Sequence, residues 1–251
     1  MSIEESIYES FVYQIKEPPV EKTVWKKPDN NKLSICLIEF REHKWLKYIL
    51  YNYSWVYGGT DVSLYIVHGT KNKEYLKNLL KDWKNVNYIE YPYENIDRKF
   101  YNDICVDVNL YKQIKTKFVL KFEIDTLIRR PIDEIFFNFS YAAPVWTGYP
   151  NDYPDNPHIK IGNKLIGNGG FSLRKVSRMI EICENHTKKT LFPEDVYITN
   201  QLKDNELPDY ELCKSFGVEW VYHDNPSGTH QLWRFHKMDN IVKLIHDLPG
   251  I

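Results

Sequence analysis

The sequence predicts an α/β fold: a single domain with a mixed, mostly parallel central sheet flanked by helices. Three observations indicate it. Strand-like and helix-like segments alternate through the first half at the spacing of a doubly wound sheet, so this half is expected to be Rossmann-like. The chain has 251 residues, enough for one domain with a sizeable core. Its content of 43% hydrophobic and 15% aromatic residues excludes a disordered protein.

Residues 1–31 are expected to be an N-terminal extension of a domain formed by residues 32–251. Pro18, Pro19 and Pro28 interrupt this segment, and lysine and glutamate dominate its second half. Its aromatic residues could pack on the domain, but we assign no chemistry to it.

Three apolar runs and three helical patterns follow in alternation. Strands are expected at residues 33–40, 62–67 and 86–91, and helices near 45–56, 75–83 and 95–114. Gly58 and Gly59 end the first of these helices.

The central strand leads to two carboxylates. Phe118, Val119 and Leu120 form the apolar run expected of a strand covered on both faces, and Glu123 and Asp125 follow it. In extended backbone these two acids project from the same side of the chain. Acids at the carboxyl end of a buried strand lie where open α/β sheets bind ligands, and a pair of them suits a hard divalent ion. The alternative is a solvated turn in which both acids face water.

After Pro131 the pattern becomes less regular. Helices are expected near residues 133–137, 175–188, 193–202 and 239–248, and other apolar segments at 141–145, 165–173 and 218–222. The stretch from Trp146 to Asn163 is rich in Pro, Asn, Asp and Tyr. Such a long irregular segment inside a compact domain usually lines or covers a site.

The first strand ends in Glu39, Phe40 and Arg41, at the place where such sheets usually bind a nucleotide. An aromatic ring can stack on a base, and an arginine can bind phosphate or a base edge with two hydrogen bonds. The alternative, equally open, is a surface ion pair beside a core phenylalanine.

A glycine-rich turn is formed by Gly167, Asn168, Gly169 and Gly170. Three glycines in four residues imply positive φ angles or close approach of a ligand to the backbone. Exposed N–H groups there could hold a sugar hydroxyl or a phosphate. The turn is not a P-loop, because no Lys-Ser/Thr follows it. A tight hairpin is the alternative.

Two further candidates lie in the C-terminal third. Asp195 begins a helix together with Pro193 and Glu194, and its carboxylate could accept a proton from an attacking hydroxyl. The same triplet is also good helix capping. His230 lies in an aromatic-rich tail, and a neutral imidazole there could complete a metal shell begun by Asp125.

Composition limits the partners. The formal net charge of −1 gives no electrostatic reason to expect nucleic acid or an anionic membrane. No apolar stretch approaches the length of a membrane span, and the acidic N-terminus lacks the apolar region of a signal peptide. The four cysteines are widely spaced, as expected of core residues in a reducing compartment. These features predict a cytoplasmic protein.

Four motifs, taken in order, resemble those of glycosyltransferases with the GT-A fold. They are Glu123-Ile-Asp125-Thr, Gly167-Asn-Gly-Gly-Phe-Ser-Leu-Arg174, Pro193-Glu-Asp-Val196 and Pro226-Ser-Gly-Thr-His230. The chain looks most like a poorly characterised glycosyltransferase-like family of microbes and large DNA viruses, whose strand end reads Gln-x-Asp. The Glu39-x-Arg41 strand end and Tyr101-Asn102 also fit its pattern, and the resemblance covers roughly residues 33–236.

The resemblance implies roles for particular residues. Asp125 is similar to the metal-binding aspartate of the Asp-x-Asp motif, His230 to the C-terminal metal ligand, and Asp195 to the catalytic base of inverting members. Positions near the nucleotide are Glu39, Phe40, Arg41 and Asn102, and those near the donor sugar and the acceptor are Asn168, Gly169 and Gly170. Glu123 departs from the Asp-x-Asp pattern, so it would touch the ribose, a water-bridged metal, or neither.

The resulting hypothesis is transfer of a sugar from a nucleotide-diphosphate sugar of the UDP or GDP type to a hydroxyl of a glycan or other acceptor. Mn²⁺ or Mg²⁺ would be the cofactor, and Asp195 would act with inversion at the anomeric carbon. The alternatives are a retaining transferase on the same fold and a non-catalytic carbohydrate- or nucleotide-binding module. A metal-dependent phosphodiesterase is disfavoured, because the sequence offers no second carboxylate–histidine cluster for a two-metal site. Neither the sugar, the base, the acceptor nor the oligomeric state follows from the sequence.

Overall fold

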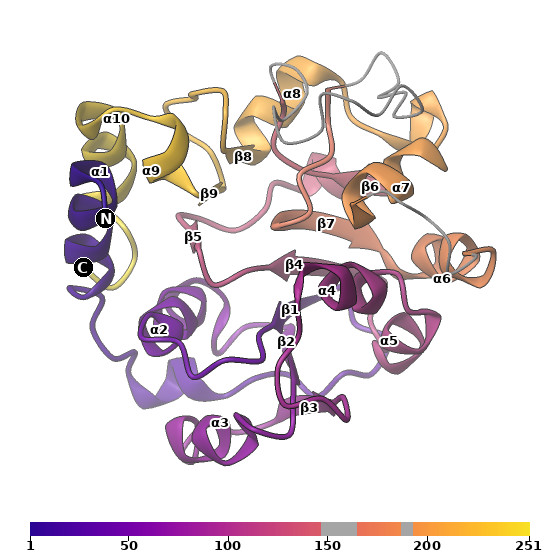
Figure 1. Cartoon of the computed structure of the whole chain (residues 1–251), viewed down its shortest axis with the longest axis horizontal. Coiled ribbons are helices and arrows are strands. Elements are labelled where there is room, and N and C mark those ends of the chain that lie inside the picture. The colour runs from indigo at the N-terminus through magenta and orange to yellow at the C-terminus, as the bar shows by residue number, and fades with distance from the viewer. Residues whose placement is uncertain (147–164, 187–192) are drawn as a thin grey trace.

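The computed structural model describes residues 1–146, 165–186 and 193–251, and within them the central sheet has six strands (Figure 1). Their order is β3-β2-β1-β4-β7-β6. The strands are β1 (Leu33–Ile38), β2 (Val62–His68), β3 (Val86–Glu90), β4 (Phe118–Phe122), β6 (Tyr141–Ala142) and β7 (Phe171–Lys175). The first four in this order pair in parallel, whereas β7 runs antiparallel to β4 and to β6. The prediction of a mixed, mostly parallel sheet is confirmed.

Helices cover both faces of this sheet. The helices of the described residues are α1 (Ile3–Val12), α2 (Leu46–Tyr57), α3 (Lys73–Leu79), α4 (Arg98–Cys105), α5 (Val108–Gln113), α6 (Val176–Glu184), α7 (Glu194–Asn200), α8 (Tyr210–Phe216), α9 (Leu232–Phe235) and α10 (Met238–Ile245), with 3₁₀ turns at Val20–Thr23, Glu134–Asn138 and Asp204–Glu206. Alternate side chains of β1 face two different cores. Ile35 and Leu37 pack in the core that includes α1, α2 and α10, while Cys36 and Ile38 pack in the core that includes α4, α5 and α6.

The helix expected at residues 95–114 is two helices. An aspartate begins each helix, because its side chain accepts a hydrogen bond from a backbone N–H two or three residues on, and the second aspartate, Asp107, causes the break. Asp97 caps α4 through the N–H of Phe100 at 2.8 Å, and Asp107 caps α5 through the N–H of Asn109 at 2.9 Å. The break leaves α4 beside the end of β4.

Residues 1–31, which the sequence indicated as an extension, contribute side chains to the main core. Tyr8 and Trp25 are buried there, and α1 packs against α9 and α10. The two chain ends lie together beside these helices (Figure 1), and the Lys16 N–H donates to the Gly250 carbonyl at 2.8 Å.

A second, three-stranded sheet stands beside the central one. It has the order β5-β9-β8, with β5 at Thr126–Ile128, β8 at Gly217–Val218 and β9 at Gly228–His230. β5 and β9 are antiparallel, and Thr126 lies opposite His230. This pairing brings the tail of the chain to the carboxyl end of β4.

No helix in the described ranges is long and apolar enough to span a lipid bilayer. All four cysteines are buried and free. Most of the irregular stretch from Trp146 to Asn163, together with the end of the helix expected at 175–188, lies outside the described residues.

Candidate functional site

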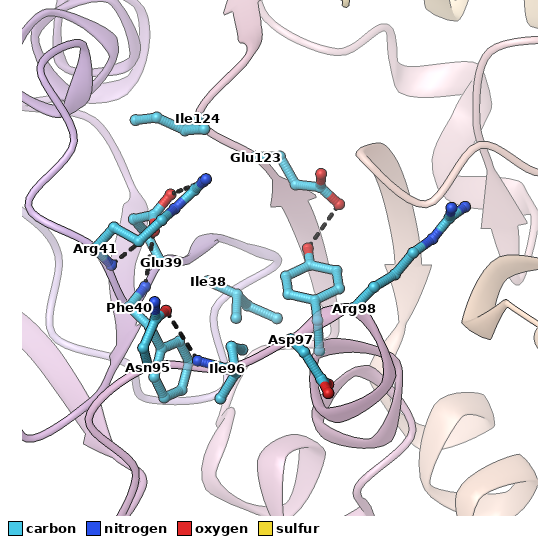
Figure 2. A pocket seen from close by; sticks show the side chains of 11 residues that line it. Ile38, Glu39, Phe40, Arg41, Asn95, Ile96, Asp97, Arg98, Glu123 and Ile124 are labelled. Atoms are coloured by element: carbon cyan, nitrogen blue, oxygen red, sulfur yellow. Dashed lines mark hydrogen bonds and ion pairs between the residues drawn. The ribbon is translucent and has the colours of Figure 1, made fainter.

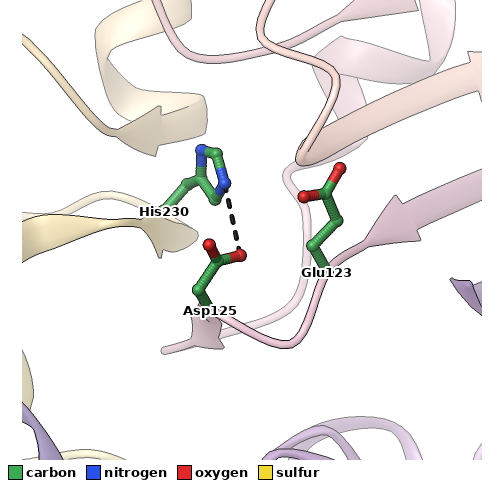
Figure 3. A group of neighbouring side chains, drawn as sticks. All are labelled: Glu123, Asp125 and His230. Atoms are coloured by element: carbon green, nitrogen blue, oxygen red, sulfur yellow. Dashed lines mark ion pairs between the residues drawn. The ribbon is translucent and has the colours of Figure 1, made fainter. Parts of the chain in front are cut away.

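Three side chains that could hold a metal ion meet just beyond the end of β4 (Figure 3). Glu123, Asp125 and His230 each offer a ligand atom, and these atoms all lie within 4.8 Å of one another. Glu123 follows β4 directly and Asp125 precedes β5, while His230 comes from β9. The chain therefore builds this cluster by pairing β5 with β9, across about a hundred residues of sequence.

Asp125 and His230 are in direct contact. His230 Nε2 lies 3.3 Å from Asp125 Oδ1, and the Gln231 amide donates to Asp125 Oδ2 at 2.7 Å. Burial raises the pKa of Asp125, but the charge of His230 and the hydrogen bond from the Gln231 amide outweigh it and lower the pKa to about 2. For His230, burial works against the charged form, yet the neighbouring carboxylates raise its pKa well above the usual range.

The donor set of this cluster fits a divalent cation. Asp125 Oδ1 and His230 Nε2 are both buried and have no hydrogen-bond partner among the described residues. Apart from their ion pair at 3.3 Å, these two buried atoms have no polar partner in the described ranges, so both could serve as ligands of a cation. Two carboxylates and an imidazole together form a donor set that divalent cations accept.

The third carboxylate is held from the opposite side. The Tyr101 hydroxyl donates to Glu123 Oε1 at 2.6 Å, and the Lys121 ammonium does so at 2.9 Å. Burial raises the pKa of Glu123, but the charge of Lys121 outweighs it and the pKa is lowered. Because both donors bind Oε1, Oε2 is the oxygen that a metal would take.

His230 is oriented by neighbours that the sequence did not single out. Glu219 Oε1 lies 3.0 Å from His230 Nδ1, on the side of the ring away from Asp125. Gly170 packs so closely against the imidazole that a Cβ there would overlap the ring. A carboxylate inside the apolar run Val218-Glu219-Trp220-Val221 was the available signal for Glu219.

The glycine turn joins the metal cluster to Asp195. The Gly169 N–H donates to Asp195 Oδ2 at 3.0 Å, and the Gly170 N–H donates to the Asn168 side chain at 2.8 Å. Burial and the charge of Glu194 raise the pKa of Asp195 to about 7, although the N–H groups of Gly169 and Val196 act against the shift. A carboxylate with this pKa is suited to general-base work near neutral pH.

Two buried cations tie the turn to the central strand. Lys121 is 3% exposed and donates to the Gly169 carbonyl at 2.6 Å, while its ammonium lies 3.4 Å from Glu194. Arg174 on β7 is fully buried and pairs with Glu194 at 3.0 Å. Lys121 interrupts the apolar run of β4, which is the sequence signal for a buried cation there, whereas Arg174 stands beside Lys175 at the polar end of β7, where no such signal marks it.

A pocket of about 390 Å³ adjoins the metal cluster (Figure 2). Its lining is Ile38, Glu39, Phe40, Arg41, Asn95, Ile96, Asp97, Arg98, Tyr101, Glu123 and Ile124. Arg41 and Arg98 stand on opposite walls in the view of Figure 2. Glu123 belongs both to this lining and to the metal cluster, so the two features are continuous.

Within the pocket, Glu39 and Arg41 form the ion pair that the sequence left open as an alternative. Arg41 Nε donates to Glu39 Oε1 and its NH2 group to Oε2, each at 2.8 Å. The Glu39 carboxylate is buried, whereas the Arg41 side chain is 55% exposed. Phe40 is 3% exposed and packs in the core that includes α4. Arg41 is therefore the member of this group that best reaches a ligand.

The family comparison matches residues 85–230, more than half of the chain, to "Protein of unknown function (DUF5672)". The chain belongs to this family. Its DUF5672 segment runs from β3 to the end of β9 and includes Glu123, Asp125, Asp195 and His230. No curated protein matches the sequence.

The DUF5672 segment also contains Asn102, which the sequence placed near the nucleotide. Asn102 is not among the residues that line the pocket. Its side-chain oxygen accepts a hydrogen bond from the Glu194 N–H at 3.3 Å and so links α4 to the start of α7. The structure thus brings Asp125 and His230 into contact. Asp195 accepts a hydrogen bond from Gly169, the neighbour of the Gly170 that packs against His230. Asn102 belongs neither to the metal cluster nor to the pocket lining.

Proposed function

We propose that this protein transfers a sugar from a nucleotide-diphosphate sugar to an acceptor hydroxyl. The observation that carries the proposal is that the metal-type cluster and the pocket share Glu123 at the carboxyl end of β4. In open α/β sheets this edge is where ligands bind. A nucleotide in the pocket would therefore extend its diphosphate toward Asp125 and His230.

The nucleotide sugar would be bound by side chains on both sides of Glu123, in the pocket and in the metal cluster. The pocket volume of about 390 Å³ lies within the range of small-ligand sites. Arg41, which is half-exposed and held by Glu39, is suited to bind a phosphate oxygen. Asp125, His230 and Glu123 would hold Mn²⁺ or Mg²⁺, which supplies positive charge to the departing diphosphate.

The transfer step uses Asp195. The acceptor oxygen forms a bond to the anomeric carbon, the bond from that carbon to the diphosphate oxygen breaks, and the acceptor proton passes to Asp195. A pKa of about 7 favours this role, because the carboxylate is then basic enough to take the proton and still ionised near neutral pH. Its hydrogen bond from Gly169 holds the carboxylate at the residue next to Gly170, which packs against His230. Attack from the face opposite the diphosphate would invert the anomeric centre.

The first test is a thermal-shift panel of UDP- and GDP-sugars with and without Mn²⁺. A donor at about one hundred times its Kd stabilises a protein by about 2.7 kcal/mol, which corresponds to roughly 5–10 °C for a chain of this size. We expect one nucleotide class to give this shift with Mn²⁺ and little without it. The Asp125→Asn variant is the control and should lose the dependence on metal. A panel in which no nucleotide sugar raises Tm contradicts the proposal.

The second test addresses the base. Asp195→Asn should leave the donor-induced shift nearly unchanged and lower turnover by about 10²–10⁴-fold. Wild-type turnover in this variant contradicts the assignment of Asp195. The anomeric configuration of the product, determined by NMR, separates an inverting from a retaining transfer.

A further inference from the structure

Glu219 lies next to His230 because of the small second sheet. β8 and β9 pair in parallel, with Val218 opposite Thr229, so the residues that follow them come side by side. Glu219 is 4% exposed, and its Oε1 lies 3.0 Å from His230 Nδ1. Its backbone is held as well, since its carbonyl oxygen contacts His236 Nε2 at 2.6 Å.

We propose that Glu219 is a positioning residue that fixes the ring and the tautomer of His230 for a divalent cation. The inference rests on the metal site of the proposed function. A carboxylate at Nδ1 keeps the proton on that nitrogen, so Nε2 is the nitrogen that would give up its proton and offer a lone pair when a cation binds. Nε2 is the atom that faces Asp125 and has no hydrogen-bond partner among the described residues.

The energetics of Glu219 favour this role over a purely structural one. Its Oε2 is buried and accepts no hydrogen bond from any described residue. A buried carboxylate with one oxygen unpartnered is costly, and an apolar residue of similar size would pack at lower cost. We therefore expect Glu219 to act on a ligand that His230 binds. Carboxylate–histidine–metal arrangements have this form.

Gly170 restricts the imidazole from another side. A Cβ at Gly170 would overlap the ring, so the imidazole of His230 uses the space that a side chain at this position would fill. The ring is therefore confined between Gly170 and Glu219 while its Nε2 faces Asp125. With the ring held in place, the tautomer depends on the hydrogen bond between Nδ1 and Glu219.

The experiment measures Mn²⁺ binding without any nucleotide, from the EPR signal of free Mn²⁺. Glu219→Leu should weaken binding about 10- to 100-fold, the usual effect of losing a carboxylate behind a metal-bound histidine. Glu219→Gln should recover most of the affinity, since its amide oxygen still accepts from Nδ1–H. Glu211→Gln removes an exposed carboxylate paired with Lys214 and should bind Mn²⁺ like the wild type.

Two results would overturn the inference. One is wild-type affinity in Glu219→Leu. The other is an equal loss in Glu219→Leu and Glu219→Gln, because the effect would then come from charge and not from orientation. If Glu219→Leu does not fold, ¹⁵N NMR of His230 in Mg²⁺-loaded wild type and Glu219→Gln decides: the Nδ1–H tautomer supports the inference and the Nε2–H tautomer refutes it.

These measurements separate the inference from the proposed function. A wild-type protein that binds Mn²⁺ in a Glu219-dependent way but transfers no sugar would refute the transferase and leave the role of Glu219 intact. A wild-type protein that binds no Mn²⁺ would overturn both.

Discussion

The raised pKa of Asp195 predicts that, without this carboxylate, the free energy of unfolding falls less between pH 5 and pH 7. The pKa is about 7 in the folded protein, against an ordinary value of 3.8. Between these values the folded protein holds a proton that the unfolded chain has lost. The folded state therefore binds more protons, and its free energy of unfolding falls as the pH rises from about 4 to 7. Asp195→Asn abolishes this contribution.

The size of the effect follows from the two pKa values. One pKa unit corresponds to about 1.4 kcal/mol, and between pH 5 and pH 7 the wild type loses about 2 kcal/mol through this residue. Asp195 is partly exposed, so this figure is an upper value. The asparagine can keep only one of the two hydrogen bonds from Gly169 and Val196, but that cost is the same at both pH values and cancels.

The assay is urea unfolding at pH 5 and pH 7 for the wild type and Asp195→Asn. With an m-value of about 2 kcal/mol/M, the wild-type midpoint should fall by up to about 1 M more than that of the variant between the two pH values. Turnover of the wild type should rise as the pH increases through about 7, because the base acts when ionised. Equal midpoint changes in the two proteins would refute the shifted pKa and, with it, the reason for choosing Asp195 as the base.

Three other perturbations test the packing around the site. Arg174→Met leaves Glu194 buried with only part of its charge compensated, so the free energy of unfolding should fall by about 3 kcal/mol in urea titrations. Gly170→Ala should displace the imidazole of His230 and weaken Mn²⁺ binding by about tenfold or more in the EPR assay. Tyr8→Phe should be neutral or stabilising, since it removes a buried hydroxyl that has no hydrogen-bond partner in the described ranges, whereas Tyr8→Ala should cost about 3–5 kcal/mol.

Each of these three predictions can be contradicted by a particular result. Lys73→Met breaks a partly exposed ion pair with Glu90 and should lower the free energy of unfolding far less than Arg174→Met does. Equal effects of the two substitutions would remove the case for a costly buried charge. Unchanged Mn²⁺ binding in Gly170→Ala would mean that the ring does not need the space. A large loss of stability in Tyr8→Phe would show that the hydroxyl has a partner.

The parallel half of the fold could be predicted because its signal is local. The strand at 33–40 and its two successors appear as apolar runs, and the structure has β1, β2 and β3 within one or two residues of them. The helix expected at 95–114 was wrong in one respect, because the capping by Asp107 that divides it competes with an otherwise continuous apolar pattern.

The second sheet could not be predicted in the same way. β5, β8 and β9 have two or three residues each, too few for a periodic pattern, and their pairing joins segments far apart in the sequence. This sheet sets His230 beside Asp125, so the sequence offered that contact only as a candidate metal shell and through a resemblance, and not through a pairing pattern. The contact of Glu219 with His230 could not be predicted for the same reason, because it depends on the pairing of β8 with β9.

Charge balance differs between the two sides of the site. On the side of the glycine turn, Lys121 and Arg174 contact Glu123 and Glu194, so buried cations meet buried anions. On the other side, Asp125 and Glu219 enclose one imidazole. Even a protonated His230 supplies one positive charge against two carboxylates, and a metal ligand must be neutral, which widens the deficit. Buried charge without compensation is costly, so the cation proposed above would balance the charge of this second side.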